Sequence, residues 1–357
     1  MKQEPPHYMS LYTRRAWITA VIAAVTLTLL MLIWYGIHVL LLLFAALLAA
    51  LAFSIPTRGL SRHTPLSGGW ALALVLLLSI GGGGGFFYWG ATRLILEGEQ
   101  LIEALPDGFD AFREQVSHWP LLPGLLDELQ SELGGGSDSV FSNWIGQATS
   151  FLTSTTGVLL NIALIAIIGL YIAAEPGIYR RGLLALVSPT RREGAEKLID
   201  VVVTRLSWWL LGQLISMTVV GLLTWTGLWL LGVPSAFTLA ALAGLLQLIP
   251  NLGPIASALP AILIAFGESP DMALWVLGLY CVVQVLESYA ITPLVQRRAV
   301  ELPPGLLMIV QVGLGTWAGL IGLVVAAPLT AAAIVITDQC YVKGWISRKR
   351  DEAAADD

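Results

Sequence analysis

The stretch from Leu206 to Gly267 contains no charged residue, and it limits the possible folds more than any other feature. A membrane helix needs about 20 mostly apolar residues, so this stretch is long enough to cross a bilayer more than once. A second run, from Ala16 to Ile55, carries no formal charge apart from the titratable His38. Only 12% of all residues are charged, whereas soluble globular proteins carry about 25%. We therefore expect an all-α protein that crosses a membrane several times.

We expect about six full spans and two interrupted C-terminal segments. The first apolar run, 16–55, is long enough for two spans joined by a turn at 35–38, and a single long tilted helix is the alternative. The predicted single spans are 69–92, 151–174, 208–231 and 272–292, and the interrupted segments are 236–266 and 305–337. Counted together, these give eight hydrophobic segments.

Residues 93–150 break the apolar pattern. Between Arg93 and Asp138 the chain holds ten acidic residues and two basic ones, and its apolar residues recur at helical spacing. We expect a small soluble helical insert, whose charges form either a solvated face or a functional one. The chain then divides into N-terminal spans (1–92), the acidic insert (93–150), a transport core (151–342) and a tail (343–357).

Basic residues predict the orientation, because loops rich in Lys and Arg remain on the cytoplasmic side. They occur at the N-terminus, in the loop at 58–62 and in the connector 175–205. Two spans in the first apolar run place all three regions on the same side. We therefore expect a cytoplasmic N-terminus, an extracytoplasmic acidic insert and a multi-pass protein of a bacterial inner membrane.

The two interrupted segments are longer than one span and contain breaks. The first breaks at Ile249–Pro254 and the second around Gly313–Gly319. If both segments are re-entrant hairpins, the basic pair Arg297 and Arg298 falls on the cytoplasmic side with the basic tail. A single tilted helix through each segment is the competing interpretation. Interrupted helices in comparable positions indicate a transport site near the middle of the membrane.

The first break holds five candidate site residues. Pro250 and Pro254 remove backbone donors, and Gly253 permits unusual dihedral angles. Gln247 and Asn251 add polar side chains. Freed backbone groups at membrane depth are tolerated only inside protein or beside water. The break is therefore either part of a solute or ion pathway or a simple kink.

Glu287 is the one acid in an otherwise apolar segment, and Gln284 lies one turn before it. A carboxylate inside a membrane is costly, so it usually faces a cavity or a partner. It could be protonated, bind a cation or pair with Arg297 or Arg298. A structural ion pair at the membrane surface is the alternative.

Two further amides, Gln213 and Gln311, are isolated within apolar segments. Hydrogen bonding between helices is the usual role of such residues. Gln311 lies in the second interrupted segment, close to its break, so we also include it among the pathway candidates.

Signatures of catalysis are absent from the sequence. It contains no phosphate-binding GxxxxGK[ST] loop, no HExxH pair and no GxSxG elbow. We expect no enzyme activity, no cofactor, no bound metal as part of a catalytic site and no nucleic-acid partner. Membrane lipids and a small polar solute or cation are the expected partners.

Several C-terminal motifs together resemble one transporter family. The run Leu248–Pro254, followed by Pro260, resembles the IPxxGP signature of the autoinducer-2 exporter-like (AI-2E) family. Glu287–Arg298 is similar to that family's E-x(5)-P segment with its following basic position. Leu302–Pro304 resembles its L-[HP]-P element, with Pro303 where histidine is common. Gly313–Pro328 resembles the closing glycine-rich helix that ends in A-x-P.

The resemblance implies export of a small polar signalling molecule such as autoinducer-2. Other family members are described as sodium or lithium/proton antiporters, so it leaves the substrate open. It also implies a homo-oligomer such as a pentamer. A membrane scaffold without transport activity, with the acidic insert as its partner surface, is a third hypothesis.

Overall fold

The computed structural model describes residues 31, 36–61, 64, 68–117, 155–291, 293, 300 and 302–340. All regular elements within these ranges are helical. Four helices are long and apolar enough to cross a membrane, or five if one bent pair counts as a single span, and shorter apolar helices accompany them. The expected all-helical, membrane-crossing architecture is confirmed at this level.

The N-terminal part contains two long helices. The helix Gly36–Ser61 is one candidate span, while the predicted span before it lies largely outside the described residues. Helix α2, Gly68–Ser117, is 50 residues long and passes residue 92 without interruption. The predicted third span and the start of the acidic insert therefore form one helix. The rest of the insert, from residue 118 onward, lies outside the described residues.

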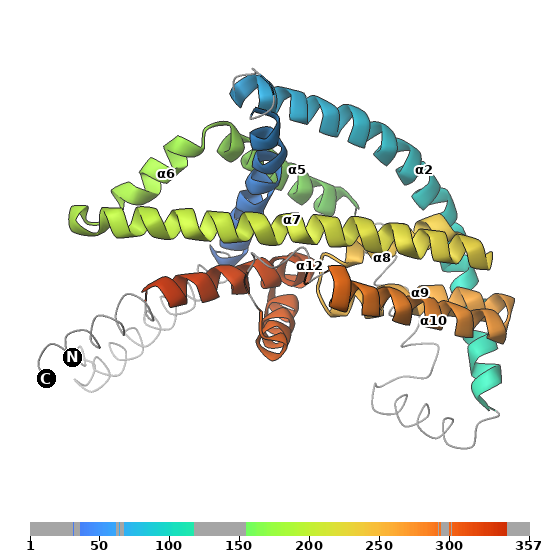
Figure 1. Ribbon diagram of the computed structural model, residues 1–357. Helices are drawn as coiled ribbons and strands as arrows, with labels where there is room; N and C mark the ends of the chain where they lie inside the picture. Colours follow the sequence, from blue (N-terminus) through green and yellow to red (C-terminus); the bar gives the residue numbers. More distant parts are fainter. Residues whose placement is uncertain are drawn as a thin grey trace, which may run out of the picture.

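The predicted basic connector consists of helices. Helix α5, Thr155–Ala174, is followed by α6, Pro176–Ala185, at an angle of 86°. A short 3-10 turn, η1 (Pro189–Arg191), leads into α7, Arg192–Leu231, which has 40 residues. A helix of that length extends about 60 Å, so α7 continues well beyond the predicted fifth span. Figure 1 shows α7 along much of the molecule, with α6 folded back beside its beginning.

The first interrupted segment is a pair of helices with a break where the prolines predicted it. Helix α8, Ala236–Leu246, and helix α9, Leu252–Glu268, pack side by side. Buried Leu239 and Ala243 of α8 share a core cluster with Ala261 and Ile264 of α9. These contacts join residues on opposite sides of the break, so the chain folds back there as a helical hairpin.

Helix α10, Pro270–Leu286, continues from α9 and packs against it (Figure 1). Ser269 caps its first turn by accepting a hydrogen bond from the backbone N–H of Met272. A π-helical turn, η2 (Glu287–Ile291), completes this segment. Helices α8 and α10 both pack against α7.

Helix α12, Pro304–Thr337, contains the second break. Gly319 has φ 59° and ψ −140°, which lies outside the helical region. A Cβ added at Gly322 would lie 2.0 Å from the carbonyl oxygen of Leu314. In a straight helix, eight residues span about 12 Å, so the chain must fold back sharply at Gly319. Near this bend only a glycine permits so close an approach of the two arms.

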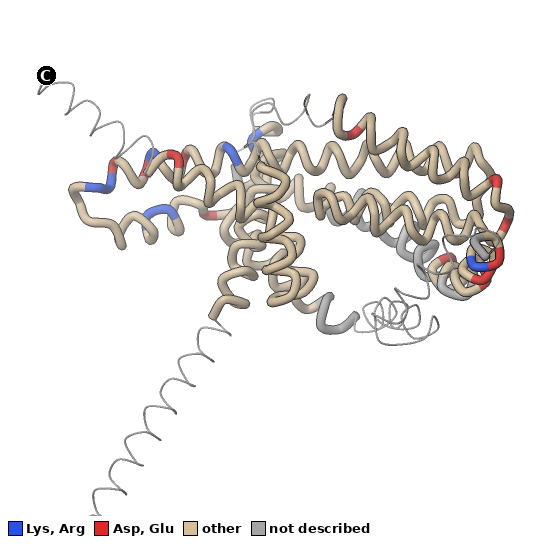
Figure 2. Tube along the Cα trace, turned by 90° about the horizontal axis from the view of Figure 1, so that it is seen from below, with Lys and Arg blue, Asp and Glu red and all other residues tan. Residues whose placement is uncertain are grey.

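The charged residues lie mainly toward two ends of the molecule. Figure 2 shows basic residues mixed with acidic ones toward one end and mostly acidic residues at the opposite end, with few charges between them. The mixed end includes Arg180, Arg191 and Lys197 of the connector, and the acidic end includes Glu268 and Asp271 beside the α9–α10 turn. This separation is typical of a protein whose middle lies in hydrocarbon.

Candidate functional site

A cleft of about 950 Å³ lies where α7, the α8–α9 break, the end of α10 and the two ends of α12 meet. Six of the residues predicted from the sequence line it: Gln247, Pro250, Asn251, Pro254, Gln284 and Glu287. These residues come from the first break and from the segment around the isolated acid. The structure thus brings two separately predicted groups to one place.

The remaining predicted residues are close to this cleft or outside the described part of the chain. Gly253 is buried within the first turn of α9. Gln311 is buried in the first arm of α12 and contacts Pro250. Arg297 lies outside the described residues, so its predicted pairing with Glu287 stays a prediction.

The backbone of the α8–α9 break explains why its residue types are needed. Asn251 has φ 67°, in the left-handed region that asparagine tolerates better than most residues. A Cβ added at Gly253 would lie 1.8 Å from the carbonyl oxygen of Leu246, so a side chain cannot fit there. Pro254 occupies the first turn of α9, where a missing N–H costs nothing.

Buried amides from other helices bond the carbonyl groups that the break releases. Gln213 of α7 donates its side-chain amide to the carbonyl oxygen of Gln247. Gln311 of α12 donates to the carbonyl oxygen of Pro250 at 2.9 Å. A buried carbonyl without a donor is costly, most of all where water is absent. The two glutamines therefore stabilise the break and fix it against α7 and α12.

Glu287, at the start of the π-helical turn, is close to polar side chains of Gln284, Ser288 and Ser216. Gln284 Nε2 and Ser288 Oγ each donate to its Oε2 at 3.3 Å, and Ser216 Oγ of α7 lies 3.5 Å from its Oε1. Hydrogen-bond donors stabilise a carboxylate that is partly removed from water. Single π-helical turns occur frequently at functional sites, so this position is suited to a solute or ion.

Two side-chain oxygens at the break are buried acceptors. Gln247 Oε1 and Gln311 Oε1 have no hydrogen-bond partner among the described residues. Within the same part of the chain, His, Cys, Asp and Glu form no group of three or more that could hold a metal ion. A cation here would therefore depend on carbonyl, amide and hydroxyl oxygens together with Glu287.

Sequence reasoning missed several lining residues, among them Arg205 and Trp209 of α7 and Asp338 just after α12. One signal could have found two of them. Arg205 is the last charge before the uncharged block, and Asp338 is the first charge after α12. Charges that border an apolar run mark the boundary of the hydrocarbon. The lining of the cleft therefore includes acidic, basic and amide side chains.

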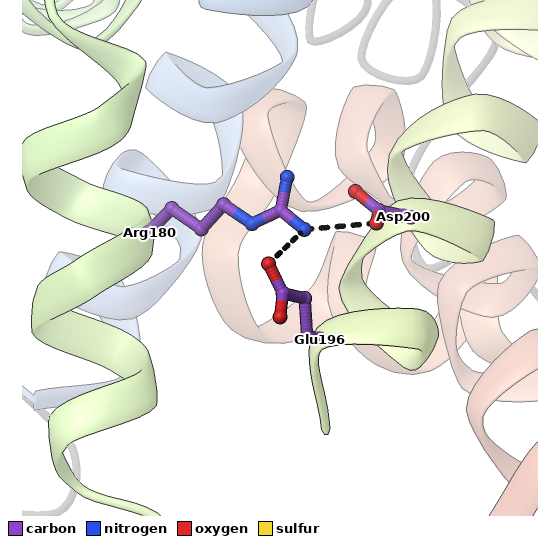
Figure 3. A network of polar contacts seen from close by, with 3 residues as sticks. All are labelled: Arg180, Glu196 and Asp200. Carbon is purple, nitrogen blue, oxygen red and sulfur yellow. Dashed lines mark hydrogen bonds and ion pairs between the residues drawn. The ribbon is translucent and has the colours of Figure 1, made fainter. Parts of the chain in front are cut away.

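A second polar network links α6 to α7 (Figure 3). Arg180 Nη2 of α6 donates to Glu196 Oε1 at 2.9 Å and to Asp200 Oδ2 at 2.8 Å, both on α7. Farther along α7 follow Arg205 and Trp209, which line the cleft. The network therefore fixes α6 to the helix that forms one wall of the cleft.

Comparisons with known proteins agree with this architecture. A family model described as AI-2E family transporter matches residues 22–341. Of the curated relatives from Bacillus subtilis (strain 168), "Putative transport protein YrrI" is 23% identical over 273 residues, which is 74% of this chain and 76% of the relative. "Putative transport protein YueF" is 25% identical over 241 residues, which is 65% of each chain. These names state transport and no substrate.

Proposed function

Because the chain belongs to the AI-2E family of transporters, we propose that it is a secondary transporter exporting a small polar solute through the cleft described above. The observation that carries the proposal is the convergence of the α8–α9 break and the Glu287 cluster on one cleft. Autoinducer-2 is the first solute to test. An ATP-driven mechanism has no support, since the sequence lacks a phosphate-binding loop.

We further propose that both interrupted segments are re-entrant hairpins in a protein with about six full spans. Two observations support this topology. The helices α8 and α9 are too short to cross a bilayer one by one, and α12 folds back at Gly319. Re-entrant hairpins are tolerated at membrane depth where protein buries them or water reaches them.

The proposed orientation has the N-terminus and the basic connector in the cytoplasm of a bacterial cell. The excess of basic residues in the connector 175–205 supports it. With this orientation the cleft residues Arg205 and Asp338 lie toward the cytoplasmic side. The solute would then enter from the cytoplasm, which suits an exporter.

In the proposed mechanism the solute binds between the hairpin tip and the Glu287 cluster. Glu287 and the hydroxyl oxygen of Ser288 accept hydrogen bonds from the solute, while Gln284 and Asn251 are able to donate. Alternating access then requires relative movement of the walls, and the two broken segments move together as long as the Gln311–Pro250 hydrogen bond is retained. Small rigid movements of paired hairpins around a fixed site are sufficient for such a cycle.

A sodium or lithium/proton antiporter is the alternative function, and the surroundings of Glu287 favour it. A single carboxylate among hydroxyl and amide groups is able to bind either a proton or a small cation. In an antiporter the two would compete for Glu287. An exporter of an organic solute has no such requirement.

Flux in proteoliposomes separates the two functions. One set of vesicles is loaded with autoinducer-2, and another carries a pH dye with sodium or lithium added outside. Release of autoinducer-2 above protein-free vesicles, with no cation-driven pH change, supports the exporter. A cation-driven pH change alone supports the antiporter. Silence in both assays from folded, inserted protein refutes autoinducer-2 as the solute and sodium or lithium antiport, and it leaves another substrate or the scaffold hypothesis.

A further inference from the structure

Helix α6 runs almost perpendicular to the helix before it. The apolar α5 ends at Ala174, and α6 leaves it at 86° after a break at Glu175. Many large apolar side chains of α5 are exposed on the chain's surface, as expected for a helix in contact with lipid. If α5 crosses the bilayer, α6 lies along its surface.

An apolar stripe follows one side of α6 and the turn after it. Tyr179, Leu183 and Leu186 are spaced by four and three residues, so they share one face. Their exposed fractions are 43%, 57% and 86%. At 100° per residue, Arg181 lies on the opposite face and Arg180 on the side toward α7. This is the pattern of an amphipathic helix at a membrane interface.

The ion pairs of Arg180 fix the depth of the helix. Its two partners on α7, Glu196 and Asp200, have exposed side-chain fractions of 52% and 57%. Exposed carboxylates do not lie in hydrocarbon, so this part of α7 lies in water or among headgroups. Because Arg180 contacts both carboxylates within 3 Å, α6 lies at the same level.

We propose that α6 is an in-plane membrane anchor whose stripe (Tyr179, Leu183 and Leu186) inserts between the lipids of the adjacent leaflet. The exposed Arg191 and Arg192, which follow the stripe in the chain, are available to meet anionic headgroups. Through Arg180 the anchor holds the first part of α7. It thereby positions Arg205 and Trp209, farther along the same helix, in the wall of the cleft.

The insertion is tested on the full chain in lipid nanodiscs. The exposed Cys281 and Cys340 are replaced by serine, and single cysteines are introduced as Leu183→Cys or Arg181→Cys. Each carries an environment-sensitive fluorophore that is quenched either by nitroxide-labelled lipid or by aqueous iodide. We expect lipid quenching at position 183 and iodide quenching at position 181.

Three results would overturn the proposal. Iodide quenching at both positions would mean that the stripe lies in water. A label at 183 that neither quencher reaches would mean that protein, such as a second copy of the chain, covers the stripe. The same labels are compared in nanodiscs with and without anionic lipid. Apolar insertion predicts lipid quenching at position 183 in both. Lipid quenching that requires the anionic lipid would indicate headgroup attraction alone and would also contradict insertion.

The role of Arg180 is tested through the mobility of the same label at position 183. Arg180→Ala removes the contacts to α7, and we expect it to increase the mobility of the label while lipid quenching persists. Lys197→Ala is the matched control, because Lys197 pairs with Glu193 within α7 itself. Equal label mobility in the two variants would show that Arg180 does not hold the anchor against α7.

Discussion

Gln311 of α12 donates a hydrogen bond to the carbonyl oxygen of Pro250, 2.9 Å away and 61 residues earlier in the chain. This contact joins the two segments that proline and glycine interrupt. The side-chain amide of Gln311, from one broken segment, bonds the Pro250 carbonyl at the break of the other segment. Any movement of the α8–α9 hairpin must therefore either carry the first arm of α12 with it or break this hydrogen bond.

We predict that Gln311→Met destabilises the protein by about 0.5–1.5 kcal/mol, because the Pro250 carbonyl loses one of two donors and keeps the backbone N–H of Leu252. Thermal unfolding in detergent, followed by tryptophan fluorescence, measures the change. Thr316→Val is the control, since Thr316 is exposed and its hydroxyl bonds carbonyls of its own helix. Equal unfolding temperatures for the two variants would contradict a stabilising role for Gln311.

Replacing Gly253 by alanine should distort the hairpin tip. The added Cβ would lie 1.8 Å from a backbone oxygen, and backbone cannot move aside as a flexible side chain does. Overpacking of this kind costs about 1–3 kcal/mol or more, and solute flux should fall with it. Gly278→Ala in α10 is the matched variant, because nothing lies within 4 Å of its added Cβ. A Gly253→Ala protein with normal stability and flux would refute the close approach.

From the fold-back of α12 we predict different effects for alanine substitutions at two of its glycines. Gly322→Ala should lower the unfolding temperature, because its Cβ would meet the carbonyl of Leu314 at 2.0 Å. Gly313→Ala should not, since that position has open space around it. If α12 were one straight helix, neither substitution would clash and the two variants would unfold alike.

Glu287→Gln retains the size of the side chain and removes its charge. If Glu287 binds the solute or cation, we expect flux to fall about tenfold or more, the effect of losing about 1.4 kcal/mol of binding or transition-state stabilisation. The control is Glu193→Gln, an exposed carboxylate in the first turn of α7 that does not line the cleft. Cation-driven proton flux that persists in Glu287→Gln would exclude this carboxylate as the antiport site.

Local sequence features predicted the helices and both breaks. The prolines at 250 and 254 mark the end of α8, and the glycine-rich stretch that ends at Gly319 contains the bend of α12. Helix breaks depend on the backbone conformations that a residue permits, and proline and glycine, which differ most from other residues in this respect, are visible in the sequence. Glu287 was predicted on a different ground, as the one acid in an apolar segment, with Gln284 one turn before it.

Contacts between distant segments were not predictable in the same way. Helical spacing predicts a helix after residue 92, but nothing in the local pattern indicates that it is continuous with the span before it. Nor does the pattern indicate that Glu97 accepts a hydrogen bond from Thr238 of α8. Arg205 lines the cleft because α7 begins at Arg192, several charged turns before the uncharged span that starts at Leu206. Helical periodicity describes one face of one helix, and it does not specify which other helix that face meets.

Chemical modification of a cysteine introduced at position 251 tests most directly whether solute crosses the protein through this cleft. Asn251 is exposed and lines the cleft at the hairpin tip. In a protein with Cys281→Ser and Cys340→Ser, Asn251→Cys is reconstituted, and flux is measured before and after a bulky methanethiosulfonate reagent and again after reduction. The exposed Thr226→Cys on α7 serves as the control for modification elsewhere. We predict that modification at 251 blocks flux and that reduction restores it, whereas full modification with unchanged flux would contradict transport through the cleft.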